Sequence, residues 1–174
     1  IIGRLVGSEM CIRDSQQPWH FVAIKDQEKK AKVRSAAEKE EKAFYSNGGH
    51  DEWISALEPI GTDASKPHLT DAPWLIVIFA ERYGLNKDGS RRKNYYVNES
   101  VGIATGFLIS AIHNAGLVCL THTPNPMKFL NSMCLRPINE KPIMILPVGY
   151  ASADATIPAA SINKKPLAEI MSVI

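Results

Sequence analysis

A hydroxyl-rich turn directly after a short apolar run is the stretch of this chain best suited to bind a ligand. The run Leu117–Leu120 has the length and apolar character of a strand, and it is followed by Thr121, His122, Thr123 and Pro124. Threonine hydroxyls both donate and accept hydrogen bonds. Because binding residues are often carried by loops on a rigid scaffold, we expect a ligand at this turn.

The other reactive side chains form no second motif. No Ser-His-Asp or Cys-His order with a convincing local pattern is present, and no Gly-x-Gly-x-x-Gly run indicates a Rossmann site. A lone histidine is more often structural than a ligand, and we expect no metal site. The five histidines are scattered: His20, His50, His68, His113 and His122.

Length, composition and charge restrict the class of protein. With 174 residues, of which 45% are hydrophobic and 22% charged, we expect one domain with its own core. A formal charge of +2 predicts neither a nucleic-acid partner nor an acidic membrane surface. The three cysteines, Cys11, Cys119 and Cys134, lack metal-ligand spacing and an even-numbered disulfide pattern, which favours a reducing, cytoplasmic location. No apolar run approaches the roughly 20 residues that span a bilayer.

The elements that must position the turn alternate between strands and helices. A largely apolar helix is expected within Asn94–Gly116, and its small residues, such as Gly102 and Gly106, would let another backbone come close. A second, strongly charged helix is expected over Lys29–Tyr45. This pattern predicts an α+β fold with a mixed sheet flanked by helices. The strands are expected at His20–Ile24, Leu75–Ala80, Leu117–Leu120 and Ile143–Tyr150.

Segments outside these elements have weaker patterns. Residues 58–70 have few large apolar groups and are a candidate for a mobile lid, while residues 82–93 are expected to form a loop. Most charges near the end of the charged helix are expected to form a solvated face with weak ion pairs. These charges are Glu38, Lys39, Glu40, Glu41 and Lys42.

The first fifteen residues fit nothing that follows them. The run Met10–Asp14 is what ATG-TGT-ATA-AGA-GAC encodes, a string that belongs to a transposase adapter used in sequencing libraries. We therefore expect residues 1–15 to be translated adapter, joined to a truncated, metagenomic reading frame.

Four stretches, Gln17–Val22, Asn94–Gly106, Leu117–Pro124 and Leu146–Tyr150, together resemble the nitroreductase superfamily of FMN enzymes. Within it, the chain is similar to the bacterial iodotyrosine deiodinases. The resemblance covers residues 16–171, and it implies a nitroreductase-like FMN domain over residues 16–174. It also implies an intertwined homodimer with the flavin sites at its interface.

The most specific part of the resemblance is a trio of substrate-binding residues. Glu41, Tyr45 four residues later and Lys66 after a further 21 have the spacing at which that family closes a lid over its substrate, here at about residues 41–70. An anion at Glu41 and a cation at Lys66 complement the ammonium and carboxylate of an amino acid. The resemblance therefore implies a halotyrosine substrate.

The resemblance also implies FMN-binding residues. Thr121, His122 and Thr123 would lie along the isoalloxazine, with the Thr123 hydroxyl bonded to flavin N5 and Thr121 and Thr123 as the catalytic pair. Lys164 occupies the place of a basic residue, usually arginine, near the FMN phosphate. Lysine keeps the charge but loses the bidentate fork.

We accordingly expect FMN-dependent reductive dehalogenation of halotyrosines, iodotyrosine giving tyrosine and iodide. The electrons would come from a reductase or from NAD(P)H. The family's arginine-serine-rich phosphate-binding segment and its Pro-Ser-Gly turn are absent here, where residues 1–15 stand, so FMN is expected to bind this chain poorly. The alternatives are a broad-substrate FMN nitroreductase or quinone reductase, and a flavin-binding fragment without turnover.

Overall fold

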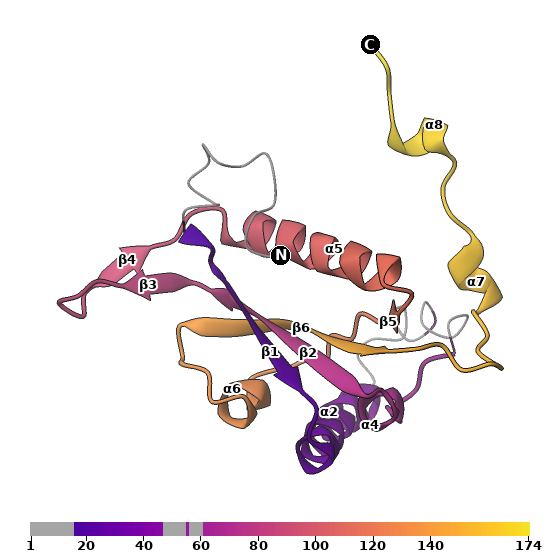
Figure 1. The fold of residues 1–174 in the computed structure, drawn as a ribbon, viewed down its shortest axis with the longest axis horizontal. Helices are drawn as coiled ribbons and strands as arrows, with labels where there is room; N and C mark the ends of the chain where they lie inside the picture. Colours follow the sequence, from indigo (N-terminus) through magenta and orange to yellow (C-terminus); the bar gives the residue numbers. More distant parts are fainter. Residues whose placement is uncertain (1–15, 47–54, 56–60) are drawn as a thin grey trace.

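The computed structural model describes residues 16–46, 55 and 61–174. Figure 1 shows a sheet with helices on both sides, a hairpin projecting from one end and a C-terminal tail at the other. In chain order the elements are β1 (Trp19–Ile24), α2 (Gln27–Ser46), α4 (His68–Asp71), β2 (Trp74–Glu81), β3 (Tyr83–Leu85), β4 (Arg91–Lys93), α5 (Val97–Asn114), β5 (Val118–Cys119), α6 (Phe129–Met133), β6 (Glu140–Gly149), α7 (Ala159–Ile162) and α8 (Leu167–Ile170).

Four strands form the main sheet in the order β1-β2-β6-β5. β2 is central and almost entirely apolar, as its continuous run of large aliphatic residues predicted. Alternate side chains of a strand point to opposite faces, so Leu75, Val77 and Phe79 enter one core while Ile78 and Ala80 enter another. Both faces of the sheet are therefore covered.

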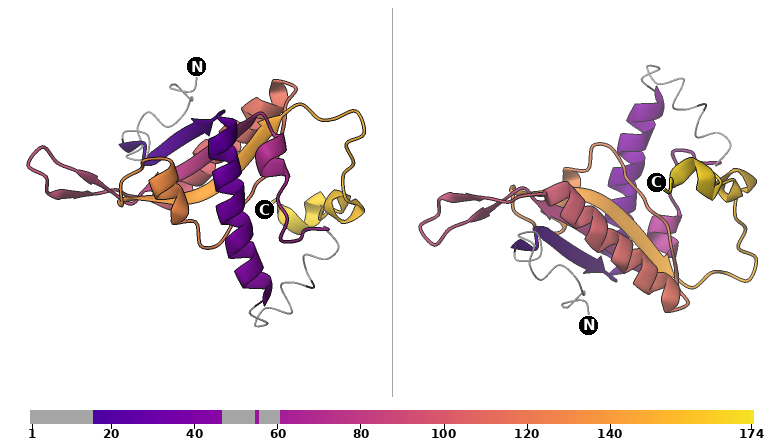
Figure 2. Two further views of the ribbon diagram at one scale, coloured as in Figure 1. Left: turned by 90° about the horizontal axis from the view of Figure 1, so that it is seen from below. Right: turned by 90° about the horizontal axis from the view of Figure 1, so that it is seen from above.

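The two cores lie under different helices (Figure 2). α2, α4 and α6 pack on the face that carries Leu75, and their buried contributions include Val33, Leu69 and Leu130. α5 packs on the opposite face through Val101 and Ile112. This arrangement confirms an α+β fold. All pairings between the described strands of this sheet are antiparallel. No parallel pair of the expected mixed sheet lies among the described residues.

Residues 82–93 differ from the expected loop, because they include the β3–β4 hairpin. The turn between its strands is closed by a hydrogen bond from Asn86 N to Ser90 O (2.9 Å), and Gly89 adopts a φ of +81°. The Asp88 carboxylate accepts a hydrogen bond from Ser90 N at 2.9 Å. Each strand has only three residues, and β4 consists of Arg91, Arg92 and Lys93, so the hairpin has no apolar alternation long enough to be visible in the sequence.

The candidate lid is described only in part. Its end at residues 66–71 packs against α2: Leu69 is fully buried, and α4 begins at His68. Residues 47–54 and 56–60 of this segment lie outside the described residues, and so does the expected adapter segment, residues 1–15.

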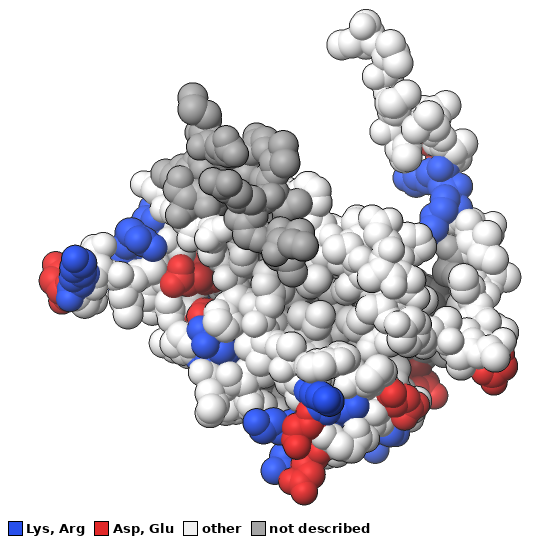
Figure 3. Space-filling view, in the orientation of Figure 1, with Lys and Arg blue, Asp and Glu red and all other residues white. Residues whose placement is uncertain are grey.

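Two apolar surfaces have no partner within the described chain. On the outer side of α5, Ile103 and Phe107 are 52% and 47% exposed, beside Gly102 and Gly106. The tail carries several more exposed apolar residues, including those of α8. Figure 3 shows charged side chains at the β3–β4 hairpin and along the lower edge, with a largely uncharged surface between them.

None of the helices in the described ranges has both the length and the apolar character needed to cross a membrane.

Candidate functional site

A cavity of about 900 Å³ lies between the C-terminal part of α2, the segment before α4, the turn after β5 and the start of the tail. Its volume is within the range of small-molecule sites. Its walls include all the sequence-predicted site residues except Lys164. The lining residues are Glu41, Tyr45, Gly61, Thr62, Asp63, Ser65, Lys66, Pro67, His68, Cys119, Leu120, Thr121, His122, Thr123, Asn125, Thr156, Ile157 and Pro158.

In the turn after β5, His122 forms two backbone hydrogen bonds with Ile145 of β6. His122 N donates to Ile145 O at 2.9 Å, and Ile145 N donates to His122 O at 2.8 Å. Along extended backbone, neighbouring side chains point to opposite sides. The His122 side chain is therefore buried, at 7% exposure, while Thr121 and Thr123 are exposed and line the cavity.

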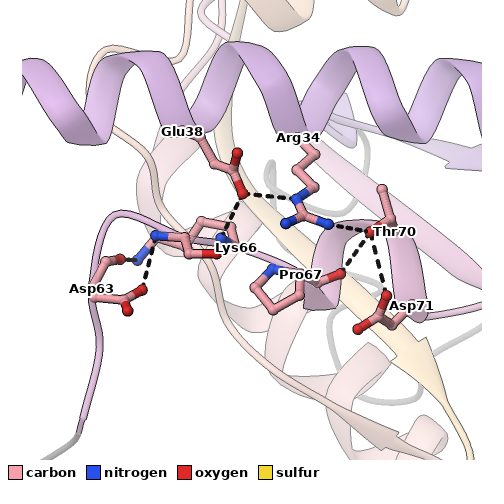
Figure 4. Close-up of polar contacts among 8 residues, drawn as sticks. Arg34, Glu38, Asp63, Lys66, Pro67, Thr70 and Asp71 are labelled. Atoms are coloured by element: carbon pink, nitrogen blue, oxygen red, sulfur yellow. Dashed lines mark hydrogen bonds and ion pairs between the residues drawn. The ribbon is translucent and has the colours of Figure 1, made fainter.

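Lys66 is the cation of the opposite wall, and it is only 4% exposed. Its Nζ lies 3.5 Å from Glu41 Oε2 and donates to Thr62 Oγ1 at 3.0 Å. Nζ also donates to the backbone carbonyl of Asp63 (Figure 4). An ammonium with so little water around it is held by its charge partner and by oxygen acceptors.

Glu38 has a larger role than the sequence suggested for the charges of this helix. Its Oε1 accepts hydrogen bonds from Arg34 Nε at 2.7 Å and from the backbone N–H of Lys66 at 2.8 Å. Figure 4 shows this carboxylate between the helix and the loop. The Lys66 backbone hydrogen bond, together with Arg34, holds the pKa of Glu38 below its usual value. The spacing of Arg34 and Glu38, four residues apart, could have suggested the pair but not the bond to a loop amide.

Tyr45 is at the far end of the same helix face as Glu41. Burial raises the pKa of Tyr45, and the nearby negative charges of Glu41 and Asp63 raise it further. The phenol is therefore protonated over the whole physiological range. Its hydroxyl can donate to, or accept from, a bound ligand.

Two histidines meet where the walls join. The His68 and His122 rings are 5.1 Å apart in an edge-on arrangement. Among the described residues, neither His68 Nε2 nor His122 Nε2 has a hydrogen-bond partner. Burial, His68 and Lys66 lower the pKa of His122 to about 4, and burial and Lys66 lower that of His68. Sequence reasoning did not select His68, because its chain neighbours form no motif and its partner is 54 residues away.

Lys164 is the predicted site residue that this structure does not bring to the cavity. It is exposed in the segment between α7 and α8. Only residues 156–158 of the tail line the cavity. The contact of Lys164 with a phosphate stays a prediction.

Comparison with known proteins adds to this geometry. Residues 4–150 match the family described as the Nitroreductase family. The iodotyrosine deiodinase of Haliscomenobacter hydrossis is 52% identical over 158 residues, which are 91% of this chain and 70% of the relative. Human iodotyrosine deiodinase 1 is 40% identical over 159 residues, which are 91% of this chain and 54% of that relative. The chain thus spans little more than half the length of its human counterpart.

One solved structure is similar in both fold and sequence. It is a crystal structure of oxidized iodotyrosine deiodinase bound to FMN and 3-iodo-L-tyrosine. The TM-score is 0.65 and the sequence identity 31%, and the match covers 81% of this chain and 71% of the other.

Proposed function

Because the chain belongs to the nitroreductase family, and within it to the iodotyrosine deiodinases, we propose that it catalyses FMN-dependent reductive dehalogenation of halotyrosines. For iodotyrosine, the aromatic C–I bond breaks, a C–H bond forms, two electrons and one proton are consumed, and iodide leaves with tyrosine. The observation that carries the proposal is that Glu41, Tyr45 and Lys66 line the same cavity as Thr121 and Thr123.

The residues present fit FMN in two respects. The cavity is large enough for an aromatic ligand, and the exposed Thr121 and Thr123 hydroxyls beside it can bond the polar edge of a planar ring. When bound, reduced FMN supplies the two electrons. The His122 side chain between these threonines is 7% exposed, lines the same cavity and contacts the His68 ring. Lys164 is the proposed phosphate contact.

The opposite wall suits a zwitterionic amino acid. The Lys66 ammonium can bind the substrate carboxylate, the Glu41 carboxylate can bind its ammonium, and the protonated Tyr45 hydroxyl can bond either group. The distance of 3.5 Å between Lys66 Nζ and Glu41 Oε2 is longer than a charge-assisted hydrogen bond, so a ligand can replace this contact at little cost. Excluding water strengthens both contacts, and this is the proposed purpose of the lid at about residues 41–70.

The Thr123 hydroxyl is the proposed catalytic donor, with Thr121 beside it on the same face of the turn. A donor fixed to a sheet strand needs little reorganisation during the reaction. The backbone bonds between His122 and Ile145 provide this rigidity.

We further propose a homodimer of the bacterial type, reduced by NAD(P)H or by a reductase. The exposed Ile103 and Phe107 beside Gly102 and Gly106 support close contact with a second copy, as does the apolar tail. The higher identity with the bacterial relative, 52% against 40% for the human one, supports the bacterial type.

The test is the Glu41→Gln variant of the FMN-loaded protein. It should lose most of its affinity for 3-iodotyrosine while it retains FMN, because the substrate ammonium loses its counter-charge. Glu40→Gln, one position earlier on α2 and outside the cavity lining, is the matched control. Unchanged iodotyrosine affinity in Glu41→Gln, together with fast NAD(P)H-driven reduction of nitroaromatics or quinones, would favour a general nitroreductase instead.

A further inference from the structure

We propose that Glu38 is a positioning residue for substrate binding, which acts by holding the backbone of Lys66. This inference rests on the proposed function, because it concerns how the substrate-binding lysine is placed. The Glu38 carboxylate accepts the Lys66 N–H at 2.8 Å and the Arg34 Nε–H at 2.7 Å. It therefore joins α2 to the loop at the residue that carries the buried ammonium (Figure 4).

Lys66 is held at both ends by one face of α2. Glu38 binds its backbone N–H, and Glu41 pairs with its side-chain ammonium at 3.5 Å. Residues three apart on a helix lie on the same face, so the two carboxylates approach the loop together. The backbone bond fixes where the lysine side chain starts, and this leaves the ammonium free to exchange Glu41 for a substrate carboxylate without displacing the loop.

A second set of contacts keeps the loop in register with the helix. Arg34 Nη1 donates to Thr70 Oγ1 at 2.9 Å, and Thr70 Oγ1 donates to Pro67 O at 2.9 Å. Lys30, itself 3% exposed, donates from Nζ to the carbonyls of Thr70 and Ala72, at 3.2 and 2.7 Å. Arg34 therefore contacts both the carboxylate that holds Lys66 and the helix that follows it.

Glu38 is not among the residues that line the cavity. We therefore expect it to affect a ligand through the groups it holds, which are the Lys66 amide and the Arg34 guanidinium, and of these two residues only Lys66 lines the cavity. Its loss should accordingly weaken halotyrosine binding while leaving the chemical step of bound substrate unchanged.

The first experiment compares Glu38→Ala with the parent and with Glu40→Ala, each loaded with FMN. Titration with 3-iodotyrosine, followed by flavin fluorescence, should show affinity about tenfold weaker in Glu38→Ala, since a charge-assisted bond to the loop is lost. The turnover number at saturating iodotyrosine should be unchanged. Glu40→Ala, which forms no ion pair with the described residues, is the control and should bind like the parent. Parental affinity in Glu38→Ala would overturn the proposal.

A double-mutant cycle tests whether the effect passes through Lys66. In a Lys66→Met background, the Glu38→Ala change should weaken iodotyrosine binding by less than about twofold, because the ammonium it positions is absent. A full tenfold loss in that background would overturn the proposal, since Glu38 would then act on the site by another route. If Glu38→Ala does not fold, Glu38→Met, which keeps approximately the size of the side chain but has no strong hydrogen-bond acceptor, replaces it in the cycle.

Amide hydrogen exchange gives a readout that requires no substrate. The Lys66 amide should exchange at least about tenfold faster in Glu38→Ala than in the parent or in Glu40→Ala, because its acceptor is gone. Equal protection of this amide in all three proteins would overturn the positioning role. If the parent binds no iodotyrosine and Lys66 still loses protection in Glu38→Ala, the proposed function fails while the anchor stands.

Discussion

The two walls of the cavity hold their polar groups in different ways. On the wall formed by α2 and the segment before α4, charged groups pair across distant parts of the chain, as Lys66 Nζ does with Glu41 at 3.5 Å. On the wall formed by the turn after β5, backbone bonds to β6 hold the chain, and the Thr121 and Thr123 side chains are exposed to the cavity. One wall thus relies on ion pairs, and the other on strand geometry.

This difference suggests a division of roles. The ionic wall can exchange its internal partners for a charged substrate, which suits recognition of a zwitterion. The wall built on the strand presents neutral hydroxyls at fixed positions, which suits a planar cofactor that must not move during the reaction. Substitutions in the first wall should therefore change affinity, and those in the second wall should change rate.

The largest effect is expected on the ionic wall. Lys66→Met should weaken 3-iodotyrosine binding about 100-fold, because it removes the buried cation and leaves Glu41 without its partner. FMN binding should be retained, since the cofactor is assigned to the other wall. Flavin-fluorescence titration measures both, and Lys42→Met, which replaces an exposed lysine of α2, is the control. A change in turnover with unchanged affinity would reverse the assignment of the two walls.

The next effect concerns His122, where the walls meet. Its pKa of about 4 in the folded protein lies below the ordinary 6.5, so the unfolded chain takes up a proton first as the pH falls. The contribution of His122 to the free energy of unfolding is therefore fully present above pH 6.5 and is lost as the pH falls toward 4. At pH 5 the free energy of unfolding should be lower by roughly 2 kcal/mol. Denaturant unfolding at pH 7 and pH 5 should show this loss, and His122→Asn should show less of it. His113→Asn, an exposed histidine of α5, is the control because it leaves the His122 imidazole in place.

A smaller, kinetic effect is expected on the wall built on the strand. Thr123→Val should reduce the rate of iodotyrosine dehalogenation about tenfold with nearly unchanged iodotyrosine affinity, because one hydrogen bond that acts during the reaction is lost. Thr121→Val, two residues earlier on the same face, should have a smaller effect. Single-turnover kinetics with reduced flavin would measure both rates. Equal rates in the parent and Thr123→Val would remove Thr123 from the proposed mechanism.

The smallest effect is expected at Thr62, a neutral partner on the ionic wall. Its hydroxyl accepts a hydrogen bond from Lys66 Nζ at 3.0 Å. Thr62→Val should weaken iodotyrosine binding only about two- to fourfold, since a neutral hydrogen bond contributes less than an ion pair held in a buried site. A loss as large as that of Lys66→Met would show that Thr62, rather than charge, places the lysine.

The strand-built half of this site could be predicted from local patterns, and the ionic half could not. The length and apolar character of the run before Thr121 and of the central run of β2 predicted strands. Because side chains alternate along extended backbone, Thr121 and Thr123 are then expected on the same side. The contact of Glu38 with the Lys66 amide joins residues 28 apart in sequence, and no local spacing predicts such a pairing. Glu41, Tyr45 and Lys66 were selected by family resemblance, while His68 was missed because only the fold brings it to His122.

A flavin-fluorescence titration of the FMN-loaded protein with 3-iodotyrosine and with tyrosine tests the central claim most directly. We expect strong quenching that saturates at low 3-iodotyrosine concentration, and much weaker quenching by tyrosine, because the ionic wall brings the halogenated ring onto the flavin beside Thr121 and Thr123. Bound flavin whose fluorescence does not respond to 3-iodotyrosine would contradict the account, since Glu41, Tyr45 and Lys66 would then not form a substrate site.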